Sequence, residues 1–242
     1  MHRLLCYNLY SPRPDDARRE RVLATIRECN ADLMGFQEIT PTWKEILEEH
    51  FSTDYAFLGN PREEGRDCEY APVLFRREKY ECIEWKTFWL SDTPEVQSRF
   101  EESKYYRICT IAEMREKKTG TEFLLSSVHM DYVWAAAEKQ ARVLLRLLDQ
   151  APGLPIAMCG DFNCNRFSPA YAILGQSRLR NAEELAEITE IRPTFQAFGK
   201  KEDTIDFVWV DGMKVHGFYV PEIKVDGLYP SDHNPLICDL NW

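Results

Sequence analysis

The run Leu154-Pro-Ile-Ala-Met-Cys-Gly-Asp-Phe-Asn163 passes from apolar to polar residues within a few positions. Its first part, Leu154 to Gly160, has the length and composition of a buried strand. The preceding stretch, Ala135–Gln150, carries alanine and leucine at helical spacing, and Glu122–His129 before it has the pattern of another strand. This order predicts a helical crossover between two strands, with polar residues where the second strand ends.

The rest of the chain repeats this alternation and adds hairpins. The turn Lys117-Lys-Thr-Gly120 joins Tyr106–Arg115 to Glu122–His129 as a pair of antiparallel strands. Three further helices are predicted: one capped by Asp15 and Asp16, one that Pro41 opens and that runs through Phe51, and one that Ser168-Pro169 starts and Gly175 ends. The remaining predicted strands are Arg3–Leu9, Asp32–Gln37, Ala71–Arg77, Glu81–Leu90, Ile205–Val210, Lys214–Pro221 and Pro235–Leu240.

Hairpins mixed with helical crossovers imply two sheets of mixed strand direction with helices outside them. No internal repeat, low-complexity segment or long linker divides the sequence. We therefore expect an α/β (α+β) sandwich, in which two packed mixed β-sheets are flanked by helices, and a single domain of residues 1–242.

The composition of the 242 residues is that of a folded protein. Hydrophobic residues make up 44% and aromatic residues 12%, enough for a sizeable core and unlike a disordered chain. The net charge of −10 and the pI near 5.1 oppose tracking of a polyanion, because proteins that follow a phosphate backbone usually carry a basic face. This balance disfavours a dedicated binder of duplex DNA but leaves a nuclease open.

The cysteines and the apolar runs bear on location. The eight cysteines are irregularly spaced, form no CxxC pair and mostly lie in apolar strand-like runs, which is typical of free buried cysteines in a reducing compartment. The first predicted strand starts almost at Met1, and no run of 18 apolar residues could cross a membrane. We expect a cytoplasmic protein with no signal peptide, no membrane span and no obligate protein partner.

Polar residues recur where the predicted strands end or begin. They are Asn8, Glu38, His129, Asp131, Asp161, Asn163, Asp206, Asp232 and His233. Strand ends that open on one rim of a packed sheet are where pockets assemble. Taken singly, each residue has an ordinary explanation, such as a cap, a turn or a histidine satisfied in the core. Asp206 lies in an apolar strand, where an unpaired carboxylate is costly, and it therefore needs a partner.

Together these residue types suit the hydrolysis of a phosphate ester. In-line attack concentrates negative charge on the non-bridging oxygens of the phosphoryl group. Carboxylate and amide oxygens hold Mg²⁺, which binds those oxygens and the leaving group. A histidine oriented by a carboxylate can exchange protons or donate to the phosphoryl group. The sequence contains both parts of such a site.

Taken in order, six short strings resemble the endonuclease/exonuclease/phosphatase family. The strings are Tyr7-Asn8, Gln37-Glu38, Val128-His-Met-Asp131, Gly160-Asp-Phe-Asn163, Ile205-Asp206 and Ser231-Asp-His233. They span nearly the whole chain, and Gly-Asp-Phe-Asn and Ser-Asp-His are the most specific of them. The resemblance implies a four-layer sandwich like that of deoxyribonuclease I and a hydrolase that depends on Mg²⁺, for which Mn²⁺ can substitute.

The resemblance also implies roles for the residues of the metal side. Glu38 matches the principal Mg²⁺ ligand, with Asn8 and Asp232 beside it. Asp161 matches the residue that orients or deprotonates the attacking water. Asn163 matches the residue that hydrogen-bonds the phosphate.

The histidines match two different positions of the family. His233 corresponds to the histidine that contacts the scissile phosphate, and Asp206 to its carboxylate partner. His129 corresponds to the second histidine, which in the deoxyribonuclease branch pairs with a glutamate on a neighbouring strand. The string Gly65-Arg-Asp-Cys-Glu69 makes Glu69 the candidate for that glutamate.

Four further residues have both an ordinary and a functional interpretation. Arg107 is either a strand arginine paired with a surface acid or a guanidinium that binds the phosphate. Asp131 is either a loop cap or a support for the site. Trp134 is predicted to stack on the substrate, with interfacial packing as the alternative. Cys164 follows Gly-Asp-Phe-Asn, but the sequence shows no dedicated base for a thiol enzyme.

The substrate stays open, because the family hydrolyses DNA, RNA, inositol phosphates, sphingomyelin and other phosphoesters. The segment Ser91–Lys104 has four acids against two bases, which makes it a poor electrostatic path for a polyanion. We therefore expect a small phosphoester or a short single strand as the phosphorylated substrate. A DNA or RNA endo- or exonuclease and a non-catalytic phosphate-binding module are the alternatives.

Overall fold

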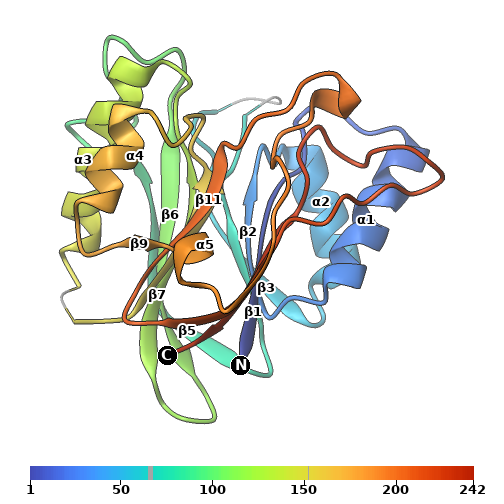
Figure 1. The fold of residues 1–242 in the computed structure, drawn as a ribbon, viewed down its shortest axis with the longest axis horizontal. Coiled ribbons are helices and arrows are strands. Elements are labelled where there is room, and N and C mark those ends of the chain that lie inside the picture. The colour runs from blue at the N-terminus through green and yellow to red at the C-terminus, as the bar shows by residue number, and fades with distance from the viewer. Residues whose placement is uncertain (65–67, 152) are drawn as a thin grey trace.

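The computed structural model describes residues 1–64, 68–151 and 153–242. The strands of these residues form one sheet of seven and a second sheet of six. Figure 1 shows the two sheets face to face, with helices on their outer sides. Outside the seven-stranded sheet lie α1 (Asp16–Cys29) and α2 (Pro41–Phe51), and outside the six-stranded sheet lie α3 (Trp134–Leu148) and α4 (Pro169–Gly175). This arrangement confirms the predicted four-layer sandwich.

The seven-stranded sheet contains the first strand of the chain at its centre. In spatial order its strands are β10 (Ile188–Glu190), β12 (Lys214–Tyr219), β13 (Leu236–Asn241), β1 (His2–Asn8), β2 (Leu33–Gln37), β4 (Val73–Arg76) and β3 (Tyr55–Leu58). Strands β1 and β2 are parallel, joined by α1, and their register pairs Asn8 with Gln37. Glu38 is the next residue, so Asn8 and Glu38 come to the same edge of the sheet.

The six-stranded sheet carries the other predicted site residues. In spatial order its strands are β5 (Tyr80–Trp89), β6 (Ile108–Glu116), β7 (Glu122–His129), β8 (Ile156–Asp161), β11 (Asp206–Asp211) and β9 (Arg180–Asn181). Strands β7 and β8 are parallel and β11 runs antiparallel to β8. The register pairs Asp161 with His129 on one side and with Asp206 on the other.

Local sequence explains where the helices begin. The side chain of Asp15 accepts a hydrogen bond from the first turn of α1, and Thr40 and Ser168 do the same for α2 and α4. Pro41 and Pro169 follow directly, at the position where a missing N–H costs nothing. These caps confirm the predicted helix starts.

Apolar side chains from both sheets fill the space between them and the space under the helices. Residues between the sheets, such as Leu33, Phe123 and Val208, are completely buried. Phe162, which alternates along the chain with Asp161 and Asn163, is also completely buried. Alternation along each strand therefore puts apolar residues inside and leaves the strand ends to polar ones.

Three strands of the structure were not predicted. They are β3, β9 and β10, and the last two have only two and three residues. Such short segments pair through the backbone of a neighbouring strand, and their side chains show no period that identifies them. A short helix, α5 (Ala182–Leu185), and a 3₁₀ turn, Ala197–Gly199, complete the described elements. Among the described residues, no helix is both long and apolar enough to cross a membrane.

Candidate active site

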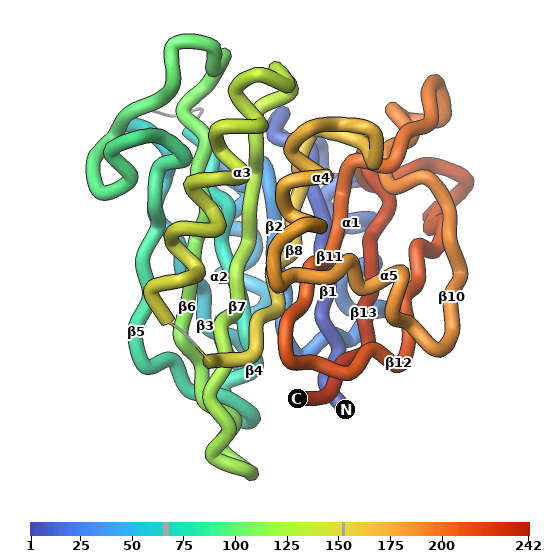
Figure 2. Tube along the Cα trace, turned by 60° about the vertical axis from the view of Figure 1, so that its left-hand side comes forward, coloured from blue at the N-terminus to red at the C-terminus, as the bar shows by residue number. Residues whose placement is uncertain are grey.

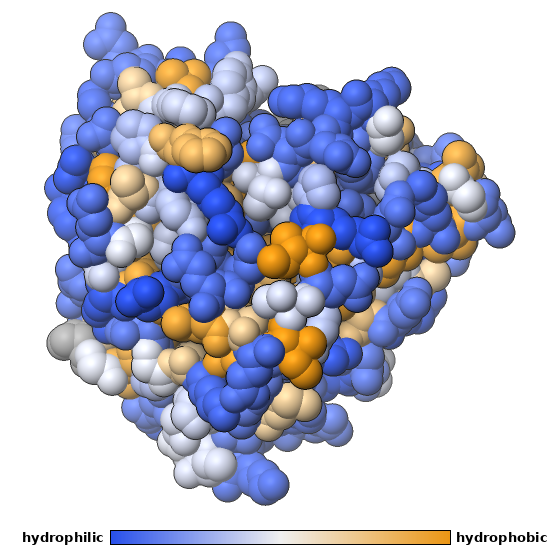
Figure 3. All heavy atoms as spheres, in the orientation of Figure 1, coloured by the Kyte–Doolittle hydropathy of each residue, from blue (hydrophilic) through white to orange (hydrophobic). Residues whose placement is uncertain are grey.

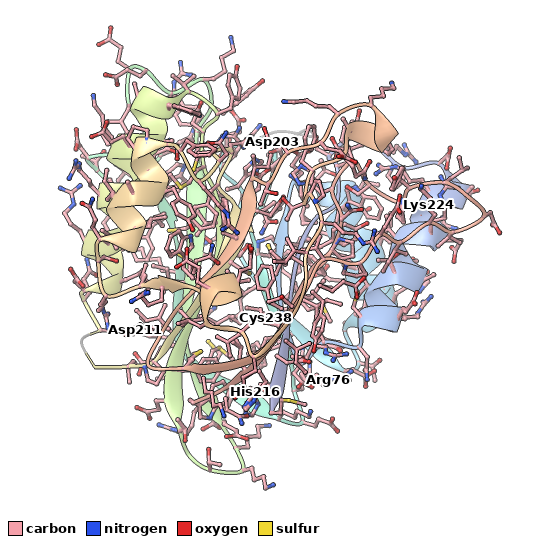
Figure 4. The ribbon with its side chains drawn as sticks, viewed as in Figure 1. Arg76, Asp203, Asp211, His216, Lys224 and Cys238 are labelled. Atoms are coloured by element: carbon pink, nitrogen blue, oxygen red, sulfur yellow. The ribbon has the colours of Figure 1, made fainter. Side chains whose placement is uncertain are left out.

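The candidate site lies at one end of the sandwich. The carboxyl ends of β1, β2, β7 and β8 and the start of β11 meet there. In Figure 4, Asp203 marks this upper end, three residues before β11, and Asp211 marks the opposite end of the same strand. Figure 2 shows both chain termini at the lower end. The two sheets thus bring their polar strand ends to the same edge.

His233 and two aspartates form the most buried part of the site. The Nδ1 atom of His233 lies 2.8 Å from Oδ2 of Asp206, and its Nε2 atom lies 3.8 Å from Oδ2 of Asp161. The ring of Phe195 packs against the imidazole with 5.0 Å between the centroids. Asp206 therefore has His233 as the partner that its buried position requires. Its second oxygen, Oδ1, is buried without a hydrogen-bond partner among the described residues.

The electrostatics of these groups are strongly perturbed. Burial raises the pKa of Asp161 to about 7, with the charge of Asp206 adding to the effect. Burial by itself lowers the pKa of His233, but the neighbouring carboxylate of Asp206 outweighs it and raises that pKa to about 10. Shifts of this kind are typical of functional sites, where charges are brought together away from water.

Asn8 connects the two sheets. Its Nδ2 amide donates hydrogen bonds to Oε1 of Glu38, at 3.1 Å, and to Oδ2 of Asp161, at 3.0 Å. The other oxygen of Glu38 accepts a 2.7 Å hydrogen bond from the backbone N–H of Ser11. Glu38 itself has a φ of 59°, in the left-handed region. Non-glycine residues held in this region concentrate at functional sites.

Asp232 comes to the site from the loop before β13. Ser231, the preceding residue, donates a 2.7 Å hydrogen bond to the carbonyl of Asn8 and ties this loop to β1. Burial raises the pKa of Asp232, and the charge of Glu38 raises it further, opposed by that of His233. The carboxylate of Asp232 is therefore close enough to Glu38 and His233 for their charges to interact.

The donor atoms fit a hard divalent cation. One oxygen or nitrogen atom from each of Glu38, His129 and Asp161 lies within 4.8 Å of the others, and so do atoms of Asp161, Asp206 and His233. The Nε2 atom of His129 lies 2.7 Å from a guanidinium nitrogen of Arg107, which engages its lone pair. The free donors are thus mainly carboxylate oxygens, which suit Mg²⁺ better than a zinc ion.

His129 and Glu69 lie next to each other, as the resemblance implied. The Nδ1 atom of His129 is 3.8 Å from Oε2 of Glu69. A closer contact to the same oxygen, 2.7 Å, comes from Arg62, which the sequence did not single out. Burial and the charge of Arg107 hold the pKa of His129 well below its usual value. Residues 65–67 of the string that pointed to Glu69 lie outside the described residues.

Arg107 is buried, with only 5% of its surface exposed. Among the described residues its ion-pair partner is the buried carboxylate of Asp131, and no surface acid pairs with it there. Its Nε atom lies 3.9 Å from Oδ2 of Asp131 and has no hydrogen-bond partner among the described residues. Asp131 accepts backbone hydrogen bonds from Lys104, Tyr105 and Val133, so it caps the loops that lead to Arg107.

Asn163 lies immediately beyond Asp161 in a left-handed conformation, with a φ of 49°. Its backbone N–H donates to Oδ1 of Asp161 at 2.8 Å, and its Nδ2 amide donates to the carbonyl of Met130 at 3.0 Å. The turn therefore orients the Asp161 carboxylate. Cys164 is buried, and burial raises the pKa of its thiol to about 11, which makes it a poor nucleophile.

Aromatic side chains are exposed in the loops that follow β7 and β8. Trp134, the first residue of α3, is 45% exposed, and Tyr132 and Phe167 are exposed as well. Figure 3 shows that polar residues cover most of the face turned toward the viewer and that apolar residues occur there in small groups. Trp134 is thus available to a substrate and does not form part of the core.

Comparison with known proteins identifies what the chain is similar to. The profile of the Endonuclease/Exonuclease/phosphatase family matches residues 5–233. The solved structure of an endonuclease/exonuclease/phosphatase from Bacteroides vulgatus is 29% identical, with 99% of this chain and 98% of that chain covered and a TM-score of 0.92. The structure of a mannosyl-6-phosphatase from Bacteroides thetaiotaomicron is 25% identical over 100% of both chains, with a TM-score of 0.87.

A curated relative is similar over part of its length. Nocturnin of Drosophila melanogaster is 25% identical over 273 residues, which cover 92% of this chain and 41% of Nocturnin. The chain therefore spans less than half the length of that relative. Sequence match, fold and the order of the strand-end residues agree: this chain belongs to the endonuclease/exonuclease/phosphatase family, whose members are phosphoester hydrolases.

Proposed function

We propose that the protein is a Mg²⁺-dependent hydrolase that cleaves a phosphoester bond by in-line attack of water, and that Mn²⁺ can substitute. The observation that supports this most strongly is the strand register. It aligns His129, Asp161 and Asp206 on neighbouring strands of one sheet. The amide of Asn8 then connects Asp161 to Glu38, which belongs to the other sheet.

The cation is assigned to the carboxylate side of the site. Glu38 would be its principal ligand, with Asn8 and Asp232 beside it. When bound, Mg²⁺ supplies Lewis-acid stabilisation of the negative charge that develops on the phosphoryl oxygens. The backbone N–H of Ser11 donates to Oε2 of Glu38 and holds this oxygen in position. The carboxylate is thereby oriented for binding a cation.

Asp161 and His233 are assigned to the reaction itself. Asp161 orients or deprotonates the attacking water, and the backbone N–H of Asn163 holds its carboxylate in position. His233 presents Nε2 toward Asp161, because Asp206 accepts a hydrogen bond from Nδ1 on the far side of the ring. The imidazole can then hydrogen-bond the scissile phosphate. Asn163 is assigned a hydrogen bond to the same phosphate.

The cluster of His129, Glu69 and Arg107 is assigned to the substrate phosphate. One guanidinium nitrogen of the buried Arg107 forms a hydrogen bond with Nε2 of His129. A buried guanidinium binds a phosphate through two parallel hydrogen bonds, which gives both charge and orientation. Glu69 offsets the positive charge of the cluster, and its carboxylate lies 3.8 Å from the opposite ring nitrogen of His129.

The substrate is proposed to be a small phosphorylated molecule or a short single strand. The net charge of −10 opposes a long polyanion. Similarity to a mannosyl-6-phosphatase supports a small substrate. Trp134 is assigned to stacking on its non-phosphate part.

Since all eight cysteines are free, a reducing compartment such as the cytoplasm is proposed for the protein. Oxidised cysteines in the protein isolated from cells would contradict that location.

A panel of substrates tests the proposal. We expect hydrolysis of bis-p-nitrophenyl phosphate or of a small monoester with Mg²⁺ or Mn²⁺, loss of the activity with EDTA and its return with excess Mg²⁺. Nucleic acids, phosphoinositides and sphingomyelin complete the panel. Cleavage of DNA or RNA that falls steeply with salt would identify a nuclease instead. Phosphate binding without turnover of any substrate would identify a binding module.

The same panel tests Trp134. The Trp134→Ala variant should raise KM for the preferred substrate, because the loss of an exposed aromatic face removes a stacking surface. Trp85→Ala is the matched control, since Trp85 is similarly exposed on β5, away from the candidate site. An unchanged KM for every accepted substrate would exclude Trp134 from substrate binding.

Arg107→Met is expected to lower kcat/KM by about 10- to 100-fold, since it removes a charged hydrogen bond of about 1.5–3 kcal/mol. Arg107→Lys should restore only part of the activity, because an ammonium lacks the fork geometry. Arg115→Met is the control on β6; its exposed pairs with Glu81 and Glu122 contribute little. Steady-state kinetics with the preferred phosphoester measure the effect. Equal losses in the Arg107 and Arg115 variants would exclude phosphate binding by Arg107.

A further inference from the structure

Arg18, in the first turns of α1, is buried beneath the candidate site. Only 9% of its surface is exposed. Its guanidinium donates to the carbonyl of Leu9 at 2.9 Å, to that of Tyr10 at 3.2 Å and to that of Pro12. Among the described residues no carboxylate forms an ion pair with it. A buried cation whose partners are all backbone carbonyls fixes the conformation of the segment that supplies them.

Two aromatic rings enclose the guanidinium. Its central carbon lies 5.1 Å from the ring centroid of Trp43, in α2, and 5.3 Å from that of Tyr10. The indole N–H of Trp43 donates to the Tyr10 carbonyl at 3.2 Å. Tyr10 has a φ of 64°, so its left-handed conformation is held by these contacts. The segment Leu9–Pro12 is thus clamped by residues of both helices.

The clamped segment supports two of the proposed cation ligands. The backbone N–H of Tyr10 donates to Oδ1 of Asn8 at 3.0 Å. The backbone N–H of Ser11 donates to Oε2 of Glu38 at 2.7 Å. The positions of both N–H groups depend on the turn that Arg18 holds. A change in that turn therefore moves or frees the side chains of both ligands.

Tyr10 also connects this turn to the loop that carries Asp232, the third proposed ligand. The ring of Tyr10 meets that of Phe198 edge-on, with 5.1 Å between the centroids. Phe198 follows Gln196 and Ala197, whose N–H groups both donate to the carbonyl of Asp232, at 2.9 and 3.0 Å. Trp43, Arg18, Tyr10 and Phe198 thus form a column of side chains in which each contacts the next. The column packs the two loops that carry the proposed ligands against α1 and α2.

We propose that Arg18 is a positioning residue for the cation site. It does not touch the cation or the substrate. It holds the turn at Leu9–Pro12, and through this turn the side chains of Asn8 and Glu38, in the geometry that binds a divalent cation. The inference rests on the proposed function, because it takes these two residues as ligands. It assigns to the first helix a part in metal affinity that its sequence does not suggest.

The test compares Mn²⁺ binding by the wild type and by Arg18→Met, measured by electron paramagnetic resonance without substrate. Residues that orient metal ligands typically change affinity by about 10- to 100-fold, so we expect a dissociation constant at least about tenfold higher. The Mg²⁺ concentration for half-maximal activity should rise by a similar factor. The kcat at saturating Mg²⁺ should change much less, because Arg18 does not act on the substrate.

Arg178→Met is the matched control. Arg178 also donates to a carbonyl, that of Leu148 at 3.3 Å, and pairs with Asp211 at 2.7 Å, but it lies at the far end of the other sheet. It should lower the melting temperature and leave Mn²⁺ affinity unchanged. Trp43→Phe keeps an aromatic ring beside Arg18 but removes the N–H that donates to the Tyr10 carbonyl, so it should also weaken Mn²⁺ binding, by less than Arg18→Met does. This variant decides the question if Arg18→Met does not fold.

Two outcomes overturn the inference. One is an unchanged Mn²⁺ affinity in Arg18→Met and Trp43→Phe, whatever the loss of stability. The other is an equal loss of affinity in Arg178→Met, which would mean that general loosening of the fold is responsible. Failure of the proposed function looks different: the wild type would then show no metal-dependent hydrolysis of any phosphoester, while the comparison of Mn²⁺ affinities would still decide the role of Arg18.

Discussion

Asp161→Asn should lower the kcat of metal-dependent hydrolysis by about three orders of magnitude, the size expected when a general base or a charge-stabilising group is lost. The carboxylate of Asp161 accepts hydrogen bonds from the amide of Asn8 at 3.0 Å and from the N–H of Asn163 at 2.8 Å. Asparagine has the same shape, so the site should keep its size. Its amide is neutral, however, and can neither take a proton from water nor offer two acceptor oxygens.

Asp239→Asn is the control for this substitution. Asp239, on β13, is also buried, and its partner is Arg3 at 2.8 Å. Loss of its charge should reduce stability without changing the rate constant of the folded protein. Steady-state kinetics and a thermal melt on both variants separate the two effects. If Asp161→Asn retained more than about a tenth of the wild-type kcat, the loss would be much smaller than is typical of a general base. The assignment of the attacking water to Asp161 would then be wrong.

The strand ends could be predicted because each is a local feature. An apolar run of five to eight residues followed by Asp, Asn, Glu or His shows where a strand stops. Residues such as Asn8 and Asp161 were found in this way, and the order of the strings then implied the fold. Their contact across two sheets could not be derived from spacing, since 153 residues separate Asn8 from Asp161.

The residues that support the site were not found from the sequence, for a physical reason. Arg62, Phe195 and Arg18 act through contacts with side chains or backbone atoms of neighbouring loops, and none of them stands at the end of an apolar run. An arginine in an amphipathic helix is usually a surface residue. Arg18 is buried because the turn at Tyr10 supplies carbonyl groups that accept its hydrogen bonds. The sequence does not identify this turn, because its left-handed residue is a tyrosine and not a glycine.

The candidate site is divided between the two sheets, and each sheet positions a different group of its residues. Glu38 and Asn8 belong to the seven-stranded sheet, and Asp161, His129 and Asp206 belong to the six-stranded sheet. Substitutions in the first group should act mainly on metal affinity, and substitutions in the second mainly on turnover. The hydrogen bonds from Asn8 are the direct link between them, so Asn8 belongs to both groups.

His233→Ala is expected to lower kcat by about two to four orders of magnitude, as is usual when a group that transfers a proton or stabilises charge is removed. His233 is almost completely buried, and its Nε2 atom is the one that faces Asp161. The substitution removes the group assigned to the phosphate and leaves Asp206 without its partner. Metal binding should persist, because the proposed ligands Glu38 and Asn8 are unchanged.

His216→Ala is the matched control for this histidine. Its Nδ1 atom lies 3.0 Å from a carboxylate oxygen of Glu187, much as that of His233 lies 2.8 Å from Asp206. Figure 4 places His216 at the end of the sandwich opposite to Asp203. The His216→Ala variant should therefore retain wild-type kinetics. Asp206→Asn should fall between the two, because it leaves the imidazole in place and removes only its orienting carboxylate. If His233→Ala and His216→Ala had the same kcat, the phosphate would be bound without His233, and Arg107 would become the main candidate for stabilising its charge.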